Sequence, residues 1–312
     1  DSRDLPTSNQ IRRYNIVILP DISSHVKRGE PQKSYLADKA VSQSQLRMLD
    51  KTPAHFKEFR DKPEPPTPAQ EFGTAFHFRI SNPNDYSNNF KTPEPCEGHL
   101  RNGKECSRFG DLYDCGWFCH QHVPPDSQPS ETNVISVEDD ETIYRMNEAI
   151  YNHKESSKIL SLATPESWEV SLRWKHNTHG FNAKARPDIL IPDKGIIVDI
   201  KTTIDSGPEY FSHAVHKFKY YWQASWYLMA ARICFPAVKW TNFVIIAVEK
   251  KRPYAVSVNN VSDYYVEIGN IEIERLSSLY HNCLTTNEWS GYGDINSIEP
   301  PEWLLRKYER TD

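Results

Sequence analysis

Two apolar, β-branched runs with charged residues inside them constrain the fold of this chain more than any other feature. They read ARPDILI at 185–191 and GIIVDIKTT at 195–203, and the turn signal PDKG joins them. Runs of this kind between turn signals predict strands, and a tight turn makes the two strands adjacent and antiparallel. Because side chains alternate along a strand, Asp199 and Lys201 share one face, and Asp188 on the neighbouring strand can join them.

These three residues indicate metal chemistry on a phosphodiester. Converging carboxylates offer hard oxygen ligands to Mg²⁺ or Mn²⁺, which keep waters and free positions for a phosphate. A lysine beside the ion can orient or help to deprotonate the attacking water and stabilise charge in the transition state. The alternative is that Asp188, Asp199 and Lys201 are solvated turn residues. Charges within an apolar run are costly to bury without a purpose, so the metal site is favoured.

The surrounding sequence predicts a mixed α/β fold. Alternating and β-branched runs indicate strands, and longer runs without Gly or Pro indicate helices. After Pro165 the expected order is βββαββα, with the first three strands as a meander, over 168–174, 185–191, 195–203, 210–234, 243–250, 254–260 and 266–283. Before Pro165 we expect a strand at 16–19 and helices at 42–59 (capped by Ser42 and interrupted by Pro53), 71–80 and 140–160.

A Cys/His-rich insertion separates two parts of this predicted fold. Residues 82–129 are rich in Pro, Asn and Gly and contain four of the six cysteines. Thiols interleaved with histidines, in a large chain without a secretion signal, favour zinc over disulfides. A structural zinc site takes four ligands, and the spacings C-x9-C and C-x2-H select Cys96, Cys106, Cys119 and His122. Reduced free cysteines are the alternative, and surplus candidate ligands are Cys115, His99 and His120.

Charge and hydropathy exclude several classes of protein. The formal net charge is −5, so basic groups that contact nucleic acid must be concentrated locally, which argues against a non-specific DNA coat. No run is long and apolar enough to span a bilayer, and the first residues, DSRDLPTSNQ, are too polar for a signal peptide. We therefore expect a cytoplasmic protein without membrane contact.

The motif residues resemble a known superfamily. RPD followed by VDIK is similar to the signature of the PD-(D/E)xK nucleases, with Asp in the variable position. The run QASWY is similar to the QxxxY element of RecB-type nucleases, and Tyr220 lies one helical turn before Gln223 on the same face. The resemblance implies that Gln223, Tyr220 and Tyr227 contact the DNA backbone or the lysine near the scissile phosphate. A packing stripe is the alternative for the tyrosines, and an iron–sulfur cluster, which some RecB-type nucleases carry, is a further alternative for the cysteines.

More specifically, the chain resembles the RecE-type exonucleases (exonuclease VIII) of phage recombination over nearly its whole length outside the insertion. The resemblance rests on SQSQLRMLDKTPAHF, EFGTAFH, the two motif strands, CLTTNEW and PPEW. It implies a restriction-endonuclease-like core with helices on both faces. The core would consist of an N-terminal part with the GTAFH helix (1–81), the zinc-binding insertion (82–129), and a catalytic part with C-terminal helices (130–312).

The same resemblance adds two residues to the expected site. It implies that His77, in the GTAFH element, is a third ligand of the catalytic metal. Glu169 lies just upstream of the motif strands, where related nucleases carry an acidic residue. It would polarise a metal-bound water or support a second metal ion. Exposure on an open face of the sheet is the alternative for Glu169.

The activity implied by the resemblance is a metal-dependent exonuclease that degrades linear double-stranded DNA from 5′ to 3′. It would leave 3′ single-stranded tails for a single-strand annealing protein. Family members close into rings, so a homo-oligomer encoded by a bacterium or a phage is expected. A structure-specific or defence endonuclease on the same core is one alternative. A zinc-containing DNA-binding protein with a degenerate site is another, although the catalytic motif is complete at Asp188, Asp199, Lys201 and Gln223.

Overall fold

The computed structural model describes residues 25–293 and 297–309, and the strand predicted at 16–19 lies outside these ranges. The helices are α1 (Gln32–Ala37), α2 (Gln43–Leu46), α3 (Pro53–Asp61), α4 (Pro68–Ser81), α5 (Tyr86–Asn89), α6 (Val137–Asn152), α7 (Lys154–Leu160), α8 (Pro208–Lys217), α9 (Tyr220–Cys234), α10 (Asp263–Thr286) and α11 (Glu302–Glu309). The strands are β1 (His25–Lys27), β2 (Phe90–Lys91), β3 (Asp111–Tyr113), β4 (Gly116–Phe118), β5 (Asn133–Val134), β6 (Ser171–Lys175), β7 (Asn182–Ala185), β8 (Ile189–Ile191), β9 (Ile196–Thr203), β10 (Asn242–Glu249) and β11 (Val256–Asn260).

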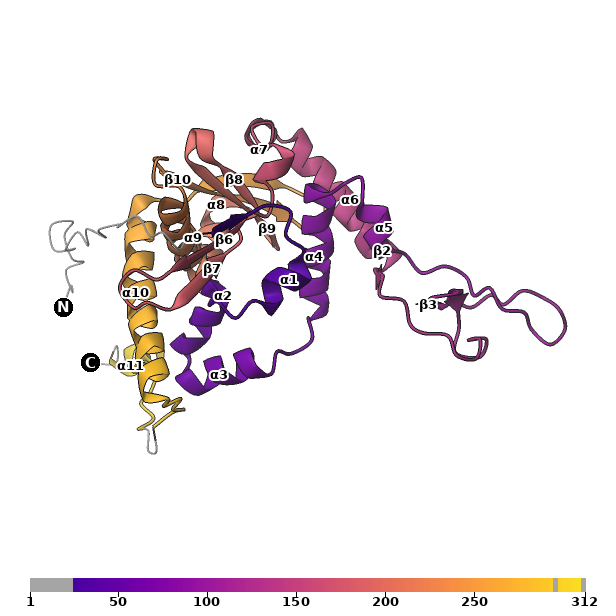
Figure 1. Cartoon of the computed structure of the whole chain (residues 1–312), viewed down its shortest axis with the longest axis horizontal. Coiled ribbons are helices and arrows are strands. Elements are labelled where there is room, and N and C mark those ends of the chain that lie inside the picture. The colour runs from indigo at the N-terminus through magenta and orange to yellow at the C-terminus, as the bar shows by residue number, and fades with distance from the viewer. Residues whose placement is uncertain (1–24, 294–296, 310–312) are drawn as a thin grey trace.

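A four-stranded sheet in the order β11-β10-β9-β8 forms the centre of the fold (Figure 1). Strand β9 runs parallel to β10 and antiparallel to β8, and β11 is antiparallel to β10. A smaller antiparallel sheet, β1-β6-β7, contributes to the same core. The predicted mixed α/β architecture, with helices on both faces of the main sheet, is therefore confirmed.

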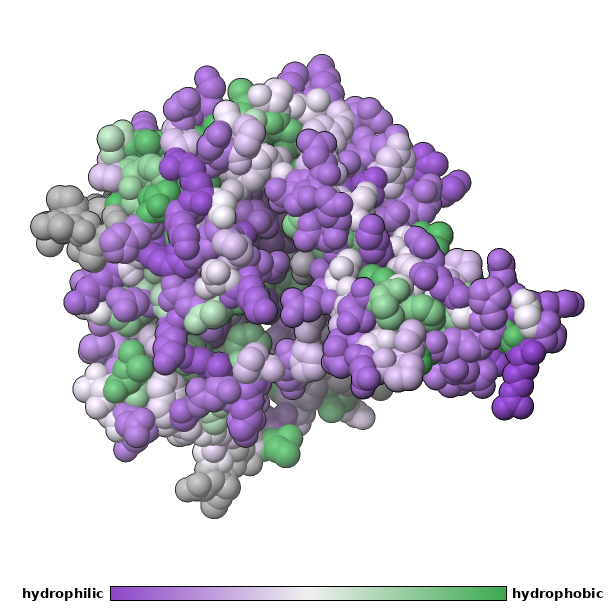
Figure 2. Space-filling model, turned by 45° about the vertical axis from the view of Figure 1, so that its right-hand side comes forward, coloured by the Kyte–Doolittle hydropathy of each residue, from purple (hydrophilic) through white to green (hydrophobic). Residues whose placement is uncertain are grey.

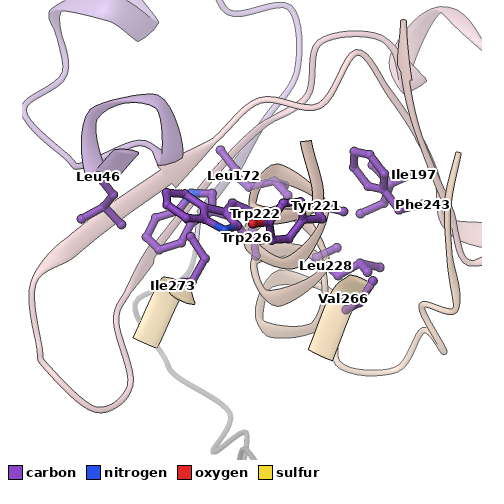
Figure 3. Packing of buried hydrophobic residues seen from close by; sticks show 14 of the residues in the cluster. Leu46, Leu172, Ile197, Tyr221, Trp222, Trp226, Leu228, Phe243, Val266 and Ile273 are labelled. Atoms are coloured by element: carbon purple, nitrogen blue, oxygen red, sulfur yellow. The ribbon is translucent and has the colours of Figure 1, made fainter. Parts of the chain in front are cut away.

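Alternation along β9 divides the core into two clusters. Ile197 faces the first cluster, which contains the side chains of α9 and α10 and is shown in Figure 3 around Trp222 and Trp226. Ile200 faces the second cluster, which is formed with α4 and α6 and contains Ala75, Phe76, Ile80, Ile143, Met146 and Ile150. A charged side chain on β9 must therefore be satisfied inside a layer of packed apolar groups.

The predicted meander over 168–203 is wrong in one respect. Strand β6 pairs with β7 in the small sheet, whereas β8 pairs with β9 in the main sheet. The run 185–191 is thus split between two sheets at Arg186–Asp188. Pro187 offers no N–H to a sheet ladder, and the Asp188 carboxylate accepts the backbone N–H of Ile200 at 2.6 Å. The Asp188 side chain thus satisfies a backbone N–H of β9 at the point where the pairing with β8 has ended.

Some predicted helices are also divided. The helix expected at 210–234 is α8 followed by α9, with Lys219 between them in a left-handed conformation at φ 60°. No Gly or Pro indicates this break. The helix expected at 140–160 is α6 followed by α7, and that at 42–59 is α2, a 3₁₀ turn and α3. Ser42 does cap α2, because its hydroxyl accepts the N–H of Gln45 in a capping box.

Residues 92–132 form an arm that projects from the body of the molecule (Figure 1). The arm leaves and rejoins the body through the parallel pair β2–β5, in which Phe90 lies opposite Asn133. It contains the β3–β4 hairpin. Figure 2 shows the arm standing out from a largely hydrophilic face. The body extends through α5 and β2, because Tyr86 and Phe90 are buried in the second cluster.

The N-terminal segment with β1 and α1 is fastened to the small sheet by ionic contacts. Glu30 accepts hydrogen bonds from Arg173 at 2.8 and 3.0 Å and from Lys27 at 3.0 Å. The buried ammonium of Lys184 donates to the backbone carbonyls of Tyr35 and Asp38 at 2.7 and 2.8 Å. Within the described residues, no helix combines the length and hydropathy that a membrane span requires.

The close contact between α9 and α10 predicts that any side chain at Gly269 destabilises the fold. A Cβ at Gly269 would lie 2.5 Å from the Tyr221 carbonyl oxygen and would clash with Ser225 Oγ. Gly269→Ala is expected to lower the free energy of unfolding by about 1–3 kcal/mol. Gly73→Ala in α4 is the matched control, because its Cβ would meet nothing within 4 Å and alanine favours a helix by about 1 kcal/mol. Urea unfolding measures both, and equal stability of the two variants would contradict the close contact.

The contacts of Glu30 predict a dependence of stability on pH. Burial would raise the pKa of Glu30, but hydrogen bonds, including those from Arg173 and Lys27, lower it from 4.5 to about 2. A lowered pKa in the folded state contributes its full stability above the unfolded value and loses it as the pH falls through the folded value. The extra stability of wild type over Glu30→Gln should therefore shrink between about pH 6 and about pH 3 in urea titrations. A constant difference over this range would rule out the pairing.

Candidate active site

Strand β9 and helix α9 hold the Asp199 carboxylate between them. Lys201 lies on the same face of β9, and its Nζ is 2.5 Å from Asp199 Oδ2. From α9, the Gln223 side-chain amide donates to Asp199 Oδ1 at 2.8 Å. The Asp199 side chain is only 2% exposed, whereas that of Lys201 is 20% exposed. The buried carboxylate is thus fixed from two sides, and the lysine beside it reaches solvent.

Asp188 and His77 approach this pair from other elements. Asp188 lies just before β8, and its Oδ2 accepts the backbone N–H of Ile200. Its Oδ1 is 3.4 Å from Nδ1 of His77, which lies on α4. The His77 and Asp188 side chains are 29% and 20% exposed, so both can be reached from outside. The structure therefore brings four of the predicted residues together from α4, β9 and the segment before β8.

The electrostatics of this group are those of two carboxylates that require a cation. Burial raises the pKa of Asp199 to about 6, the charge of Asp188 adds to this effect, and Lys201 opposes it. Burial would also raise the pKa of Asp188, but His77 and Lys201 lower it. Burial would lower the pKa of His77 and Lys201, but the carboxylates raise both. The two carboxylates are thus offset by Lys201 and by the protonated form of His77, whose place a metal ion could take.

The donor set fits a divalent cation. An ion would relieve the repulsion between Asp188 and Asp199, and carboxylates are ordinary ligands of Mg²⁺ or Mn²⁺, whereas an imidazole such as that of His77 is more typical of transition metals. The 3.4 Å spacing of His77 and Asp188 is close to the separation of about 3 Å between ligands of one ion. Asp199 is turned towards Lys201 and Gln223. The ligand atoms of His77, Asp188 and Asp199 therefore do not all lie within 4.8 Å of one another. Among the described residues, the cysteine cluster of the arm meets this criterion.

The two predicted tyrosines have different surroundings. The Tyr220 ring centre is 5.1 Å from Nζ of Lys201. Tyr227 is partly buried, and its ring lies 6.1 Å from that of Phe243 in the core. Burial and then the Asp199 charge raise the pKa of Tyr227. Tyr220 therefore borders the site directly, whereas Tyr227 combines core packing with proximity to Asp199.

Glu169 differs from its expected setting. It precedes β6 instead of lying in a strand, and its φ of 47° places it in the left-handed region. Its carboxylate accepts a hydrogen bond from Arg186 at 2.6 Å, and its backbone N–H donates to the Asp188 carbonyl at 2.9 Å. The strand prediction fails because the chain bends here to reach Asp188. The observed contacts of Glu169 are structural ones beside the site.

Sequence reasoning missed a cationic group next to the site. Arg186, Lys184 and Arg173 surround the ring of Tyr35 at 5.5, 4.6 and 5.8 Å. Arg186 stands two positions before Asp188, and this proximity was the available signal. Nothing local relates Tyr35 to strands about 150 residues later. The N-terminal segment thus contributes an aromatic group to the border of the site.

The arm brings the four predicted zinc ligands together. His122 Nδ1 lies 3.3 Å from Cys96 Sγ and 3.5 Å from Cys119 Sγ, and Cys106 Sγ is 4.0 Å from Cys119 Sγ. Ligands of tetrahedral zinc are separated by about 3.8 Å when the Zn–S bonds are about 2.3 Å. Cys115 is exposed, contacts Ser127 and lies outside the group. The geometry fits one zinc ion and excludes Cys115 from its first coordination sphere.

Comparisons with known proteins agree with this fold. The crystal structure of a "Putative exonuclease" from Eubacterium rectale superposes with a TM-score of 0.51 at 12% sequence identity, covering 89% of this chain and 98% of that one. At this identity the likeness concerns the fold alone. No curated protein matches the chain. Residues 42–300, well over half of the sequence, match a family described as a PDDEXK-like domain of unknown function. The chain therefore belongs to this family of PDDEXK-like domains (DUF3799).

Proposed function

We propose that this protein is a nuclease that hydrolyses DNA phosphodiester bonds with a divalent metal, Mg²⁺ or Mn²⁺. The observation that carries the proposal is the convergence of Asp188, Asp199, Lys201 and His77 at one partly open point. The first two residues and His77 would hold the ion. The ion would polarise the phosphoryl oxygen and acidify its bound water. The family membership supports the same class of reaction.

The protein side chains would prepare the site in distinct ways. Lys201, held against Asp199, would orient the attacking water and stabilise negative charge that develops on the phosphate. Gln223 would keep the Asp199 carboxylate in place through its amide. Tyr220, beside Lys201, would contact the DNA backbone, and Tyr227 would support Gln223 from the core.

The resemblance predicts that Glu169 polarises a metal-bound water or supports a second metal ion, but its contacts support a different role. Its carboxylate is occupied by Arg186, and its N–H holds the carbonyl of Asp188. We propose that Glu169 positions Asp188 by fixing the backbone at the junction of the two sheets.

The finer activity we propose is degradation of linear double-stranded DNA from 5′ to 3′, giving 3′ tails for recombination. Its support is the resemblance of the GTAFH element, the motif strands and the C-terminal segments to RecE-type exonucleases. The name of the protein from Eubacterium rectale, which has the same fold, agrees with exonuclease chemistry. A ring-shaped homo-oligomer and an annealing protein as partner belong to the same proposal.

An endonuclease on the same core is the second candidate. The two differ on covalently closed circular DNA, which has no end for an exonuclease. An inactive DNA-binding protein is disfavoured, because Asp199 is still in contact with Lys201 and Gln223. Cleavage of closed circles would therefore replace the exonuclease proposal by the endonuclease one and leave the site unchanged.

Substitutions in the β8–β9 hairpin test the proposed site. Asp199→Asn and Lys201→Ala are expected to reduce degradation of end-labelled linear duplex in Mg²⁺ by about 100-fold or more, because each removes charge from the reaction centre. Asp193→Asn is the matched control, because Asp193 is exposed in the turn of the same hairpin, and it should retain wild-type activity. If Asp199→Asn and Lys201→Ala digest the duplex as fast as wild type, the site lies elsewhere.

We also propose that the arm binds one structural zinc ion through Cys96, Cys106, Cys119 and His122. Cys119→Ser should lose the bound zinc and lower the midpoint of thermal unfolding of the arm, since structural zinc contributes directly to folding. Cys115→Ser, outside the group, is the control and should retain one equivalent of zinc. Elemental analysis of purified protein measures both. Equal zinc in the two variants would refute the ligand set, and iron with a visible absorbance band would indicate an iron–sulfur cluster instead.

A further inference from the structure

A cleft opens at the carboxyl end of β9, between this strand and α8. Three aromatic side chains line it, namely those of Tyr210, Phe218 and Tyr220. Lys217, Lys250 and two histidines line it as well, and no acidic side chain does. Its volume of about 530 Å³ lies in the range of sites that bind small ligands. For a chain with net charge −5, such a concentration of cationic and aromatic groups is a local feature of this surface.

The aromatic rings are arranged for stacking. Tyr210 is 43% exposed and Phe218 is 45% exposed, although both are large apolar groups. The ring centres of Phe218 and Tyr220 are 5.7 Å apart at an interplanar angle of 27°. The Lys217 ammonium lies 5.5 Å from the Phe218 ring. Exposed rings with neighbouring cations are the pattern by which proteins bind unpaired nucleic acid, because every base has a face that can stack.

The acidic residues near the cleft in sequence do not line it. Glu249 accepts hydrogen bonds from the backbone and hydroxyl of Ser206. Asp205 accepts the N–H of Gly207. Glu209 lies in the first turn of α8 and does not line the cleft. A phosphate in the cleft would therefore meet Lys217 and Lys250 without a facing carboxylate.

The cleft adjoins the proposed reaction centre at Tyr220. Tyr220 lines the cleft and also lies 5.1 Å from Nζ of Lys201. Thr202, the residue after Lys201, is part of the lining. On the other side, the Lys250 ammonium is 5.8 Å from the ring of Phe72, on the helix that carries His77. A strand lying in the cleft would thus pass Tyr220, which borders Lys201.

We propose that this cleft binds the unpaired nucleotides of the strand being cut, immediately beside the scissile phosphate. Bases stack on Tyr210 and Phe218, and phosphates contact Lys217 and Lys250. Bases within a duplex are already stacked on each other, so the cleft selects single strands and frayed ends over continuous duplex. This inference rests on the proposed nuclease function and specifies the form in which the substrate reaches the site.

Binding without cleavage tests the cleft separately from the chemistry. The probe is a fluorescently labelled oligothymidylate, titrated with the full chain in EDTA and followed by anisotropy. The variant Tyr210→Ala/Phe218→Ala should bind it about 10- to 100-fold more weakly, the loss expected for one or two stacked bases. Affinity for a blunt duplex of the same length should change much less. Tyr264→Ala, at an exposed tyrosine of α10, is the matched control and should bind like wild type.

The lysines give a second readout. Removing two phosphate contacts in Lys217→Gln/Lys250→Gln should reduce the slope of log K against log salt by about 1.4, because each contact with a single strand contributes about 0.7. Unchanged oligothymidylate binding in both double variants would overturn the proposal. So would an equal loss of duplex binding, or a change in oligomeric state alone, which would make the cleft a contact between subunits.

A wrong assignment of the reaction centre would give a different result from a wrong assignment of the cleft. Asp199→Asn should bind the oligonucleotide as tightly as wild type while it fails to cut. If Asp199→Asn cuts normally and the cleft variants still lose binding, the assignment of the reaction centre is wrong. The single-strand cleft would then remain as a nucleic-acid site in its own right.

Discussion

The rest of the structure depends on one buried carboxylate. Asp199 lies in the middle of the central sheet, where an uncompensated charge would be costly. Its two partners, Lys201 and Gln223, must therefore be held at hydrogen-bonding distance. Gln223 fixes the position of α9 over the sheet, and the close contact at Gly269 sets α10 against α9. Burial of apolar side chains drives the packing of the first cluster, and that packing holds Gln223 at the Asp199 carboxylate.

The junction between the two sheets orients the Asp188 carboxylate in a way that a single continuous sheet could not. A continuous meander would place Asp188 in a ladder, with its backbone satisfied and its side chain directed by alternation alone. The change of sheet at Pro187 frees the Asp188 carboxylate to accept the Ile200 N–H while its other oxygen faces His77. Glu169, in a left-handed conformation just before β6, stabilises the bend through its N–H, which donates to the Asp188 carbonyl. Such local departures from ideal geometry commonly coincide with functional sites.

Sequence predicted those features that depend on local periodicity. The antiparallel pairing of the motif strands and the shared face of Asp199 and Lys201 follow from alternation, and both are present. The assignment of His77 to the site rests on family resemblance, because no sequence spacing relates α4 to β9. Pro187 is a local signal for the division of 185–191, whereas no local signal indicates the helix break at Lys219 or the approach of Tyr35 to Arg186. The approach of Tyr35 to Arg186 is a contact between distant segments, which local patterns do not encode.

The attachment of the arm also affects how the domain can vary. Because β2 and β5 pair side by side, the chain resumes close to where it departed, and the core around Tyr86 and Phe90 is closed without the intervening residues. The arm can therefore be lengthened, exchanged or deleted as one unit without altering the distance between His77 and Asp188. The hydrolytic core and the cysteine cluster are joined in one chain but are free to diversify at separate rates.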